Sequence, residues 1–167
     1  MIYVPSHQFA TDACLLGGGA MFDGDWCYVS WEVDMPEFVN SNINVLELQV
    51  VHLAAERWAS KWTGKHVVVR SDNVSTVASI NKGTSRSVEM LGIIQKLFWL
   101  SVEFGFKLSA VHIPGRLNVL SDRISRLHDA QCACDAMFYL TKDAELEVCG
   151  HMTHKSYLWL QGCWGMI

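Results

Sequence analysis

Three carboxylates of this 167-residue chain stand at positions where a packed domain gains nothing from a charge. Asp12 lies inside an extended apolar segment, Glu47 shares the apolar stripe of a helix with Val51, and Asp72 follows a valine-rich run. The fourth acid, Asp122, lies in the last predicted helix. An unpaired carboxylate in apolar surroundings is costly, so it pairs with a cation, keeps a proton or binds a metal. Carboxylate oxygens suit hard cations such as Mg²⁺ and Mn²⁺, so these acids are candidate ligands of a divalent metal.

Each acid also has a simpler structural explanation. Asp12 could pair with a buried arginine, Glu47 could lie at the rim of its stripe, and Asp72 could cap the helix that follows. Asp122 precedes Arg126 by four residues, the spacing of a helix-surface ion pair worth about 0.2–0.5 kcal/mol. Three acids from two strands and one helix of the same sheet domain are harder to explain in this way together, which favours the metal site.

The hydrophobic pattern predicts the elements that position these acids. Short extended runs bounded by turn residues predict strands over residues 8–14, 20–22, 26–33, 66–70 and 107–113. Apolar residues at helical spacing predict helices over residues 44–62, 88–104 and 117–127, with another after Asp72. The glycines at 17–19 predict a turn between the first two strands. Alternating strands and helices indicate an α/β domain, and the early three-strand meander makes its five-stranded sheet mixed.

Charge and cysteine content divide the chain after Leu127. Residues 1–127 hold eleven basic and twelve acidic side chains, whereas residues 128–167 hold two basic and five acidic ones and four of the six cysteines. We therefore expect one domain over 1–127 and an acidic, cysteine-containing extension over 128–167. In that extension, Cys132 and Cys134 are separated by one residue, which does not fit the usual spacing of zinc ligands.

The order of the motifs resembles type 1 ribonuclease H. The residues that carry this resemblance are Thr11-Asp12-Ala13, Val45-Leu46-Glu47-Leu48 and Arg70-Ser71-Asp72-Asn73. Residues 112–118 (HIPGRLN) and 121–126 (SDRISR) look like the closing motif of retrotransposon ribonuclease H domains. The resemblance covers residues 8–127 and is closest to the domains that follow reverse transcriptase in DIRS-like and Ty3-like retroelements.

The resemblance implies a ribonuclease H-like fold with helices on both faces of the sheet. It implies an endonuclease that hydrolyses the RNA strand of RNA/DNA hybrids with two Mg²⁺ ions, or Mn²⁺ as a substitute. Asp12 would contact both ions, Glu47 and Asp72 would complete one site, and Asp122 would complete the other. The loop 114–117 lacks the histidine of cellular relatives, as is usual in the Ty3-like branch, and His112 is expected to be a core or sheet-edge residue. A reverse-transcriptase domain in a parent polyprotein is the implied partner. An inactive remnant that binds nucleic acid or protein is the alternative.

Substrate contacts are expected from polar residues near the acids. Lys82 and Arg86 bracket a short polar loop suited to backbone phosphates, or form an ordinary solvated loop. Asn44 could bond a ribose hydroxyl or cap the first long helix. The full set of predicted substrate residues is Asn44, Asn73, Lys82, Arg86, Arg116 and Asn118.

Composition narrows the function classes. The hydrophobic fraction of 50% and the net charge of −4 exclude a disordered chain, and a pI near 5.9 disfavours a purely electrostatic nucleic-acid binder. We expect no membrane span, because no apolar run approaches about 18 residues. The start of the chain lacks the pattern of a secretory signal, and six cysteines without one indicate a reducing, intracellular location in cytoplasm or nucleus. Without the four proposed ligands, residues 1–127 hold eleven basic and eight acidic side chains, which predicts weak binding of nucleic acid.

Overall fold

Five strands form one mixed sheet in the computed structural model, which describes residues 7–129. The strands are β1 (His7–Ala13), β2 (Gly17–Phe22), β3 (Asp25–Ser30), β4 (His66–Ser71) and β5 (Lys107–His112). Their order across the sheet is β3-β2-β1-β4-β5, with β3, β2 and β1 antiparallel and β1, β4 and β5 parallel. The predicted mixed five-stranded sheet is confirmed.

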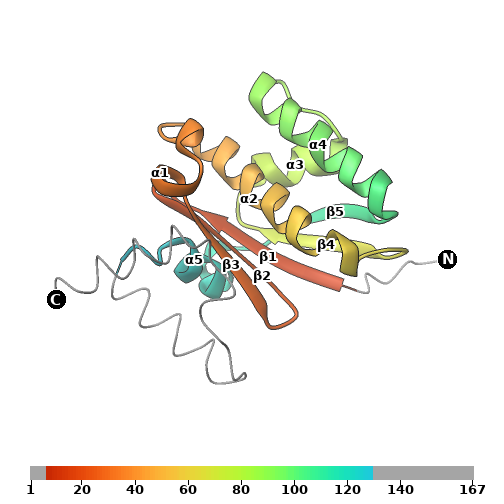
Figure 1. Cartoon of the computed structure of the whole chain (residues 1–167), viewed down its shortest axis with the longest axis horizontal. Helices are drawn as coiled ribbons and strands as arrows, with labels where there is room; N and C mark the ends of the chain where they lie inside the picture. Colours follow the sequence, from red (N-terminus) through yellow and green to blue (C-terminus); the bar gives the residue numbers. More distant parts are fainter. Residues whose placement is uncertain (1–6, 130–167) are drawn as a thin grey trace.

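Helices cover both faces of this sheet, as predicted (Figure 1). The α-helices are α1 (Trp31–Asp34), α2 (Ile43–Trp58), α3 (Val74–Lys82), α4 (Val88–Phe104) and α5 (Val119–Ser125). Short 3-10 helices span Pro36–Phe38, Ala59–Lys61 and Gly115–Leu117. Helices α2, α3 and α4 lie on one face, and α5 lies on the other (Figure 1). The long α2 is buried along most of its length, because it packs on β1 and β2 and is covered by α4.

An aromatic cluster holds α2 against the sheet. Trp58 and Trp62 are fully buried, and the ring centroids of Phe9 on β1 and Trp62 lie 4.9 Å apart. Phe22 on β2 lies 5.6 Å from both tryptophan rings. Each such aromatic side chain buries about 150–250 Å² of surface, and this packing dominates the energetics of the core. The cluster lies at the opposite end of α2 from Glu47 and fixes the direction in which that helix crosses β1.

The predicted turn at residues 17–19 is wrong, because these glycines form the first half of β2. Their role is close packing. A Cβ added to Gly18 would lie 2.2 Å from Val50 Cγ2 on α2, and one added to Gly19 would lie 2.5 Å from the backbone nitrogen of Ser125 on α5. The two glycines face opposite sides of the strand, so bare backbone at β2 lets a helix approach the sheet from each face.

We expect Gly19→Ala to lower the free energy of unfolding by about 1–3 kcal/mol, because the methyl group would collide with backbone of α5. Gly92→Ala is the matched control. Gly92 lies within α4, and no atom of residues 7–129 meets an added Cβ within 4 Å there. That change should raise stability by up to about 1 kcal/mol through helix propensity. Urea unfolding of both variants tests the pair, and an unchanged midpoint for Gly19→Ala would contradict the packing of α5 on β2.

Three predicted boundaries also differ from the structure. The third strand ends at Ser30, because its hydroxyl accepts a hydrogen bond from Val33 N and so caps α1. The helix predicted to reach residue 62 ends at Trp58 and continues as a 3-10 turn. The last helix begins at Val119, and Leu117, expected at the start of its apolar stripe, is 60% exposed.

Nearly all of the predicted extension lies outside the described residues. Residues 130–167, and with them Cys132 and Cys134, are among those that the structure does not describe. Within residues 7–129, no helix has the length and apolar content needed to cross a membrane.

Candidate metal centre

Three of the four predicted acids meet at the carboxyl edge of the parallel strands. Asp12 is on β1 one residue before its end, Asp72 directly follows β4, and Glu47 is in the second turn of α2, which crosses β1. One carboxylate oxygen from each of the three lies within 4.8 Å of the others. Parallel strands bring their carboxyl ends to one edge of a sheet, and ligands of open α/β sheets bind there. This cluster, which contains three of the four acids named from the sequence, is called the acidic triad below.

Glu47 is the most deeply buried member of the acidic triad. Its Oε1 accepts a hydrogen bond of 3.1 Å from the backbone N–H of Ala13, and the residue is 4% exposed. Among the described residues, its buried Oε2 has no hydrogen-bond partner. Burial, followed by the nearby charge of Asp12, raises the pKa of Glu47 to about 9, and the Ala13 N–H opposes this rise. A buried carboxylate oxygen without a hydrogen-bond partner, on a side chain that belongs to a cluster of acids, is what a bound cation would satisfy.

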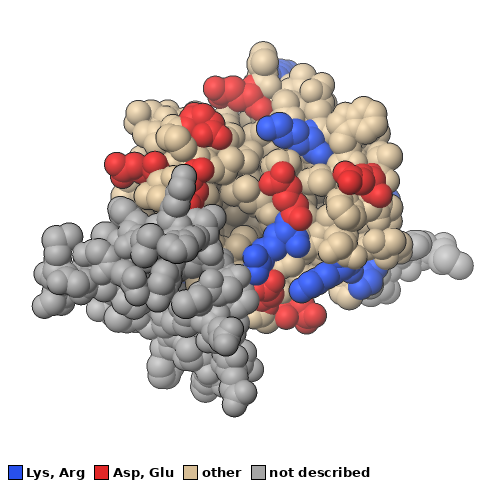
Figure 2. All heavy atoms as spheres, viewed as in Figure 1, with Lys and Arg blue, Asp and Glu red and all other residues tan. Residues whose placement is uncertain are grey.

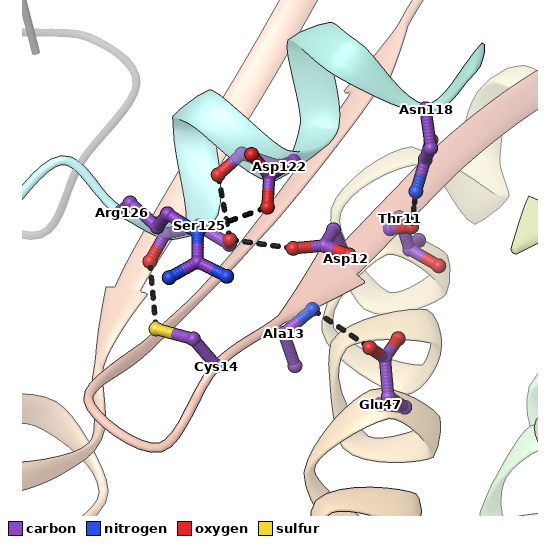
Figure 3. A network of polar contacts seen from close by, with 9 residues as sticks. All are labelled: Thr11, Asp12, Ala13, Cys14, Glu47, Asn118, Asp122, Ser125 and Arg126. Atoms are coloured by element: carbon purple, nitrogen blue, oxygen red, sulfur yellow. Dashed lines mark hydrogen bonds and ion pairs between the residues drawn. The ribbon is translucent and has the colours of Figure 1, made fainter. Parts of the chain in front are cut away.

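Asp12 is held by α5, which lies on the face of the sheet opposite to α2 and Glu47 (Figure 1). The hydroxyl of Ser125 donates a hydrogen bond of 2.6 Å to Asp12 Oδ2 (Figure 3). Asp12 is 5% exposed, and burial raises its pKa to about 6. The Ser125 hydrogen bond lowers that pKa, whereas the negative charges of Asp72 and Asp122 raise it further. The buried acids therefore repel one another while no cation is present.

Asp72 does not cap the following helix, so the simpler explanation of this acid is wrong. Asn73 is the cap of α3, and its side-chain oxygen accepts a hydrogen bond of 2.9 Å from Thr76 N. The carboxylate of Asp72 instead lies against the loop after β5, where a Cβ added to Gly115 would be 2.8 Å from its Oδ2. The absence of a side chain at Gly115 leaves room for the Asp72 carboxylate within the acidic triad.

Asp122 lies apart from the acidic triad. Its Oδ1 accepts a hydrogen bond of 2.9 Å from Arg126 Nε, and its side chain is 45% exposed. This is the helix-surface ion pair of the simpler explanation. Asp122 is nevertheless close enough for its charge to raise the pKa of Asp12. The predicted role of Asp122 in a second ion site stays a prediction.

No protein-family model and no curated protein matches this chain. Several solved structures, in contrast, match this chain. The LC11 ribonuclease H1, isolated from compost and solved with an RNA/DNA hybrid, is 19% identical over 71% of this chain and 93% of its own, with a TM-score of 0.54. Ribonuclease H1 of Halobacterium salinarum is 14% identical over 78% of this chain and 98% of its own, with a TM-score of 0.55. This chain has the ribonuclease H fold.

A third solved structure places the same fold inside a larger protein. The foamy viral protease-reverse transcriptase, solved in complex with an RNA/DNA hybrid, is 11% identical over 73% of this chain, with a TM-score of 0.52. The match covers only 20% of that viral chain. The ribonuclease H fold of the present chain therefore corresponds to a small part of the viral polypeptide.

Two of the predicted substrate residues form an amide bridge beside the acids in this ribonuclease H fold. Asn73 Nδ2 donates a hydrogen bond of 2.8 Å to Asn44 Oδ1, which links the start of α3 to the start of α2. The cap of α2 is Asn42, whose side chain accepts a hydrogen bond of 2.9 Å from Asn44 N, so the alternative role of Asn44 as that cap is wrong. Both bridging side chains are half-buried, and Asn44 and Asn73 lie close in sequence to Glu47 and Asp72.

Asn118 is a buried residue that links two elements of the fold. It is 3% exposed, and its Nδ2 donates a hydrogen bond of 2.9 Å to the backbone oxygen of Thr11 (Figure 3). This bond ties the start of α5 to β1, next to Asp12. The burial of Asn118 argues against the predicted contact with substrate and indicates that it positions α5.

Two of the three predicted basic residues, Lys82 and Arg86, line a groove. Lys82 ends α3, Arg86 lies in the loop before α4, and both are exposed. With Asn44 they line a groove of about 460 Å³. Arg116 is exposed in the loop after β5. Elsewhere positive and negative side chains are interspersed over the face seen in Figure 2, so no broad basic surface dominates that view.

His112 lies at the end of the edge strand β5, in agreement with the expected sheet-edge position. It is exposed, and its Nε2 lies 3.1 Å from the backbone oxygen of Asp72. Its contact is therefore with the backbone next to the acidic triad.

The sequence reasoning missed Ser125 as part of the site. Ser125 follows Asp122 by three residues, and residues three apart on a helix share a face. That spacing was the available signal. It could not show that this face of α5 is turned toward Asp12, because the orientation depends on how α5 packs on β2.

Proposed function

We propose that this chain is a metal-dependent ribonuclease H that hydrolyses the RNA strand of RNA/DNA hybrids. The observation that carries the proposal is the acidic triad at the carboxyl edge of a ribonuclease H sheet, in which Glu47 has a buried carboxylate oxygen without a hydrogen-bond partner among residues 7–129. Two of the structural neighbours, the LC11 ribonuclease H1 and the foamy viral protein, were solved in complexes with RNA/DNA hybrids. That shared ligand supports the same substrate class for this chain.

The residues present fit divalent ions such as Mg²⁺ or Mn²⁺. All three side chains of the acidic triad offer carboxylate oxygens, the ligands that these hard cations prefer. The raised pKa values of Asp12 and Glu47 arise from burial and mutual repulsion, both of which a cation would offset. Asp12, Glu47 and Asp72 would hold the metal, with Asp122 as a fourth ligand for a second ion.

The chain's own residues hold the site in shape for hydrolysis. The Ala13 N–H fixes Glu47, the Ser125 hydroxyl fixes Asp12, and the Gly115 loop lies against Asp72. Divalent ions, when bound, would orient water and phosphate and stabilise the charge that develops on the attacking and leaving oxygens. Attack by water at phosphorus breaks the bond to the 3′ oxygen and leaves a 3′-hydroxyl and a 5′-phosphate. No nucleophilic side chain is needed.

The distribution of polar groups supports recognition by shape and ribose hydroxyls. The bridged amides of Asn44 and Asn73 lie beside the acidic triad, within reach of a 2′-hydroxyl, which distinguishes RNA from DNA. The groove with Lys82 and Arg86 begins at Asn44 and suits the phosphates of a strand that lies next to the cleaved one. Such contacts position a duplex without reading its sequence, so we expect little sequence preference.

Retroelement origin and a tethered partner complete the proposal. The motif at residues 112–126 resembles retrotransposon domains, and one structural neighbour is a protease-reverse transcriptase. Residues 1–127 have almost no net charge, so the isolated domain is expected to bind duplexes weakly. A reverse-transcriptase domain in a parent polyprotein would supply the missing affinity by holding the hybrid nearby.

The deciding experiment is cleavage of a labelled RNA/DNA hybrid in Mg²⁺ or Mn²⁺, beside RNA/RNA and DNA/DNA duplexes of the same sequence. We expect cleavage of the RNA strand of the hybrid alone. Asp12→Asn is the matched control, because an amide oxygen still accepts the Ser125 hydrogen bond while the charge is lost. Wild-type cleavage no greater than that of Asp12→Asn would overturn the proposal. Binding of the hybrid without cleavage would favour the alternative, an inactive binding module.

Neutralising the groove should weaken the binding of hybrid and make it less sensitive to salt. In the Asp12→Asn background, where the hybrid stays intact, Lys82→Gln with Arg86→Gln should lower the slope of log affinity against log salt by about 2, roughly one per lost phosphate contact. Lys61→Gln, at the far end of α2, is the control and should leave the slope unchanged. Fluorescence anisotropy at several salt concentrations measures these slopes. Equal slopes for the two variants would show that phosphates do not follow the groove.

A further inference from the structure

The last turn of α5 rests directly on the backbone of β2. A Cβ added to Gly17 would lie 2.8 Å from the backbone oxygen of Ser125, and one added to Gly19 would lie 2.5 Å from its backbone nitrogen. Ser125 itself is fully buried. Because no side chain separates the helix from the strand, the backbone of Ser125 is fixed relative to the sheet.

This placement brings the Ser125 hydroxyl to Asp12. Asp12 pairs with Gly19 across the two strands, so the residue beneath Ser125 is the direct neighbour of the acid. The hydroxyl oxygen lies 2.6 Å from Asp12 Oδ2 and 2.8 Å from the backbone oxygen of Asp122. A distance of about 2.5–2.7 Å is typical of a hydroxyl that donates to a carboxylate. One side chain thus contacts two of the proposed metal ligands, which come from different elements.

The bond from Ser125 determines how the Asp12 carboxylate is turned. Rotation of an aspartate carboxylate about its last side-chain bond is only weakly restricted by sterics, so a hydrogen bond decides it. Within residues 7–129, the Asp12 carboxylate accepts its side-chain hydrogen bond from the Ser125 hydroxyl, and the accepting atom is Oδ2. Figure 3 shows Ser125 on one side of Asp12 and Glu47 on the other. The remaining oxygen is therefore free to face the acidic triad.

We propose that Ser125 is a positioning residue of the metal centre, whose hydroxyl turns one oxygen of Asp12 toward Glu47 and Asp72 before any ion binds. This inference rests on the proposed function, because it assumes that the acidic triad binds divalent ions. It assigns to α5 a role beyond the supply of Asp122. The bare backbone at Gly17 and Gly19 is the feature of β2 that makes the contact possible.

The test is direct binding of Mn²⁺ to the metal-free chain, measured by isothermal titration calorimetry on Ser125→Ala. We expect the dissociation constant to rise about 10-fold, the lower end of the effect of removing a partner that orients a metal ligand. Ser121→Ala is the matched control. Ser121 is 1% exposed on the same helix, and its hydroxyl has no hydrogen-bond partner in the part of the chain that the structure describes. That variant should bind Mn²⁺ like the wild type.

Activity gives a second and different readout. If Ser125 only orients a ligand, a saturating concentration of Mn²⁺ should restore most of the hybrid cleavage lost in Ser125→Ala, while KM for the hybrid stays constant. Should Ser125→Ala fail to fold, as judged by circular dichroism, Ser125→Cys supplies a side chain of similar size with a much weaker donor. It should also bind Mn²⁺ more weakly than the wild type.

The outcomes separate this inference from the proposed function. Failure of the wild-type chain to bind Mn²⁺ would refute the metal centre itself. Wild-type binding with an unchanged or lower dissociation constant in the folded Ser125 variants would overturn the positioning role alone. An equal loss in Ser121→Ala would assign the effect to the packing of α5 and likewise overturn it.

Discussion

Replacing Glu47 by glutamine is expected to lower metal-dependent hybrid cleavage by roughly 10³-fold and, at the same time, to stabilise the metal-free chain. The loss of cleavage follows from the removal of a charged ligand from the acidic triad, where ion binding supplies several kcal/mol of transition-state stabilisation. The gain in stability follows from burial. Glu47 is 4% exposed and, within residues 7–129, has an oxygen without a hydrogen-bond partner, so ionising its carboxyl group in the fold is unfavourable until a cation binds.

The size of this gain can be estimated from proton linkage. Burial raises the pKa of Glu47 from its ordinary value of 4.5 to about 9, so at neutral pH the folded chain must keep a proton that the unfolded chain releases. Each pH unit above the lower value costs about 1.4 kcal/mol, which amounts to roughly 3 kcal/mol near pH 7. Glutamine avoids this cost, and its side-chain oxygen still accepts the hydrogen bond from Ala13 N.

Hybrid cleavage assays and urea unfolding of the metal-free variants measure the two effects. Glu56→Gln is the matched control, because Glu56 lies on the same helix with its side chain 52% exposed. This change should leave cleavage intact and alter stability by less than about 0.5 kcal/mol. A Glu47→Gln variant that still cleaves would remove Glu47 from the site. One that is less stable than the wild type would show that the carboxylate is stabilised in the fold by a contact other than a metal.

The sequence was sufficient to predict the sheet and the acidic triad, because both depend on local pattern. A buried valine-rich strand followed by an acid, and an acid within a helical apolar stripe, indicate their elements and their edge of the sheet without knowledge of the tertiary structure. The glycines of β2 show where such reasoning fails. Three consecutive glycines have the local preference of a turn, and only the approach of α2 and α5 explains why they form a strand.

The contacts that support the site could not be predicted from the sequence, for the same reason. Ser125 and Asn118 bond to β1 from α5, at sequence separations of 113 and 107 residues. Asn118 and Asn44 are polar residues beside acids, and from sequence alone a structural amide cannot be distinguished from one that contacts substrate. Their hydrogen-bond partners make that distinction. Charges that must lie together leave a signal in sequence, whereas the residues that orient them do not.

The metal-free chain should lose stability as pH rises from 7 to 8, by about 1.4 kcal/mol over that interval. The direction of this change in stability follows from the raised pKa of Glu47. Its pKa in the fold, about 9, lies above the ordinary value of 4.5, so its contribution is fully present at low pH and disappears as pH rises toward 9. Within this window the folded chain binds one more proton than the unfolded chain, and that proton is on Glu47.

The other buried groups with shifted pKa values titrate mainly outside the interval from pH 7 to 8. Asp12, with a pKa of about 6, has already lost its proton at pH 7. Burial lowers the pKa of His52 from 6.5, so its opposite effect is confined to lower pH. The pKa of Cys27 is raised from 9.0 to about 12, which acts mainly above pH 8. The slope between pH 7 and 8 is therefore assigned to Glu47.

Urea unfolding at several pH values, with and without Mg²⁺, measures the slope. Saturating Mg²⁺ should flatten it, because a cation favours the ionised carboxylate and binds more tightly as the proton leaves. Glu47→Gln should show almost no slope in either condition, since it has no proton to release. A wild-type slope that persists in Glu47→Gln would assign the proton to another group, and a slope unaffected by Mg²⁺ would separate the buried proton of Glu47 from metal binding.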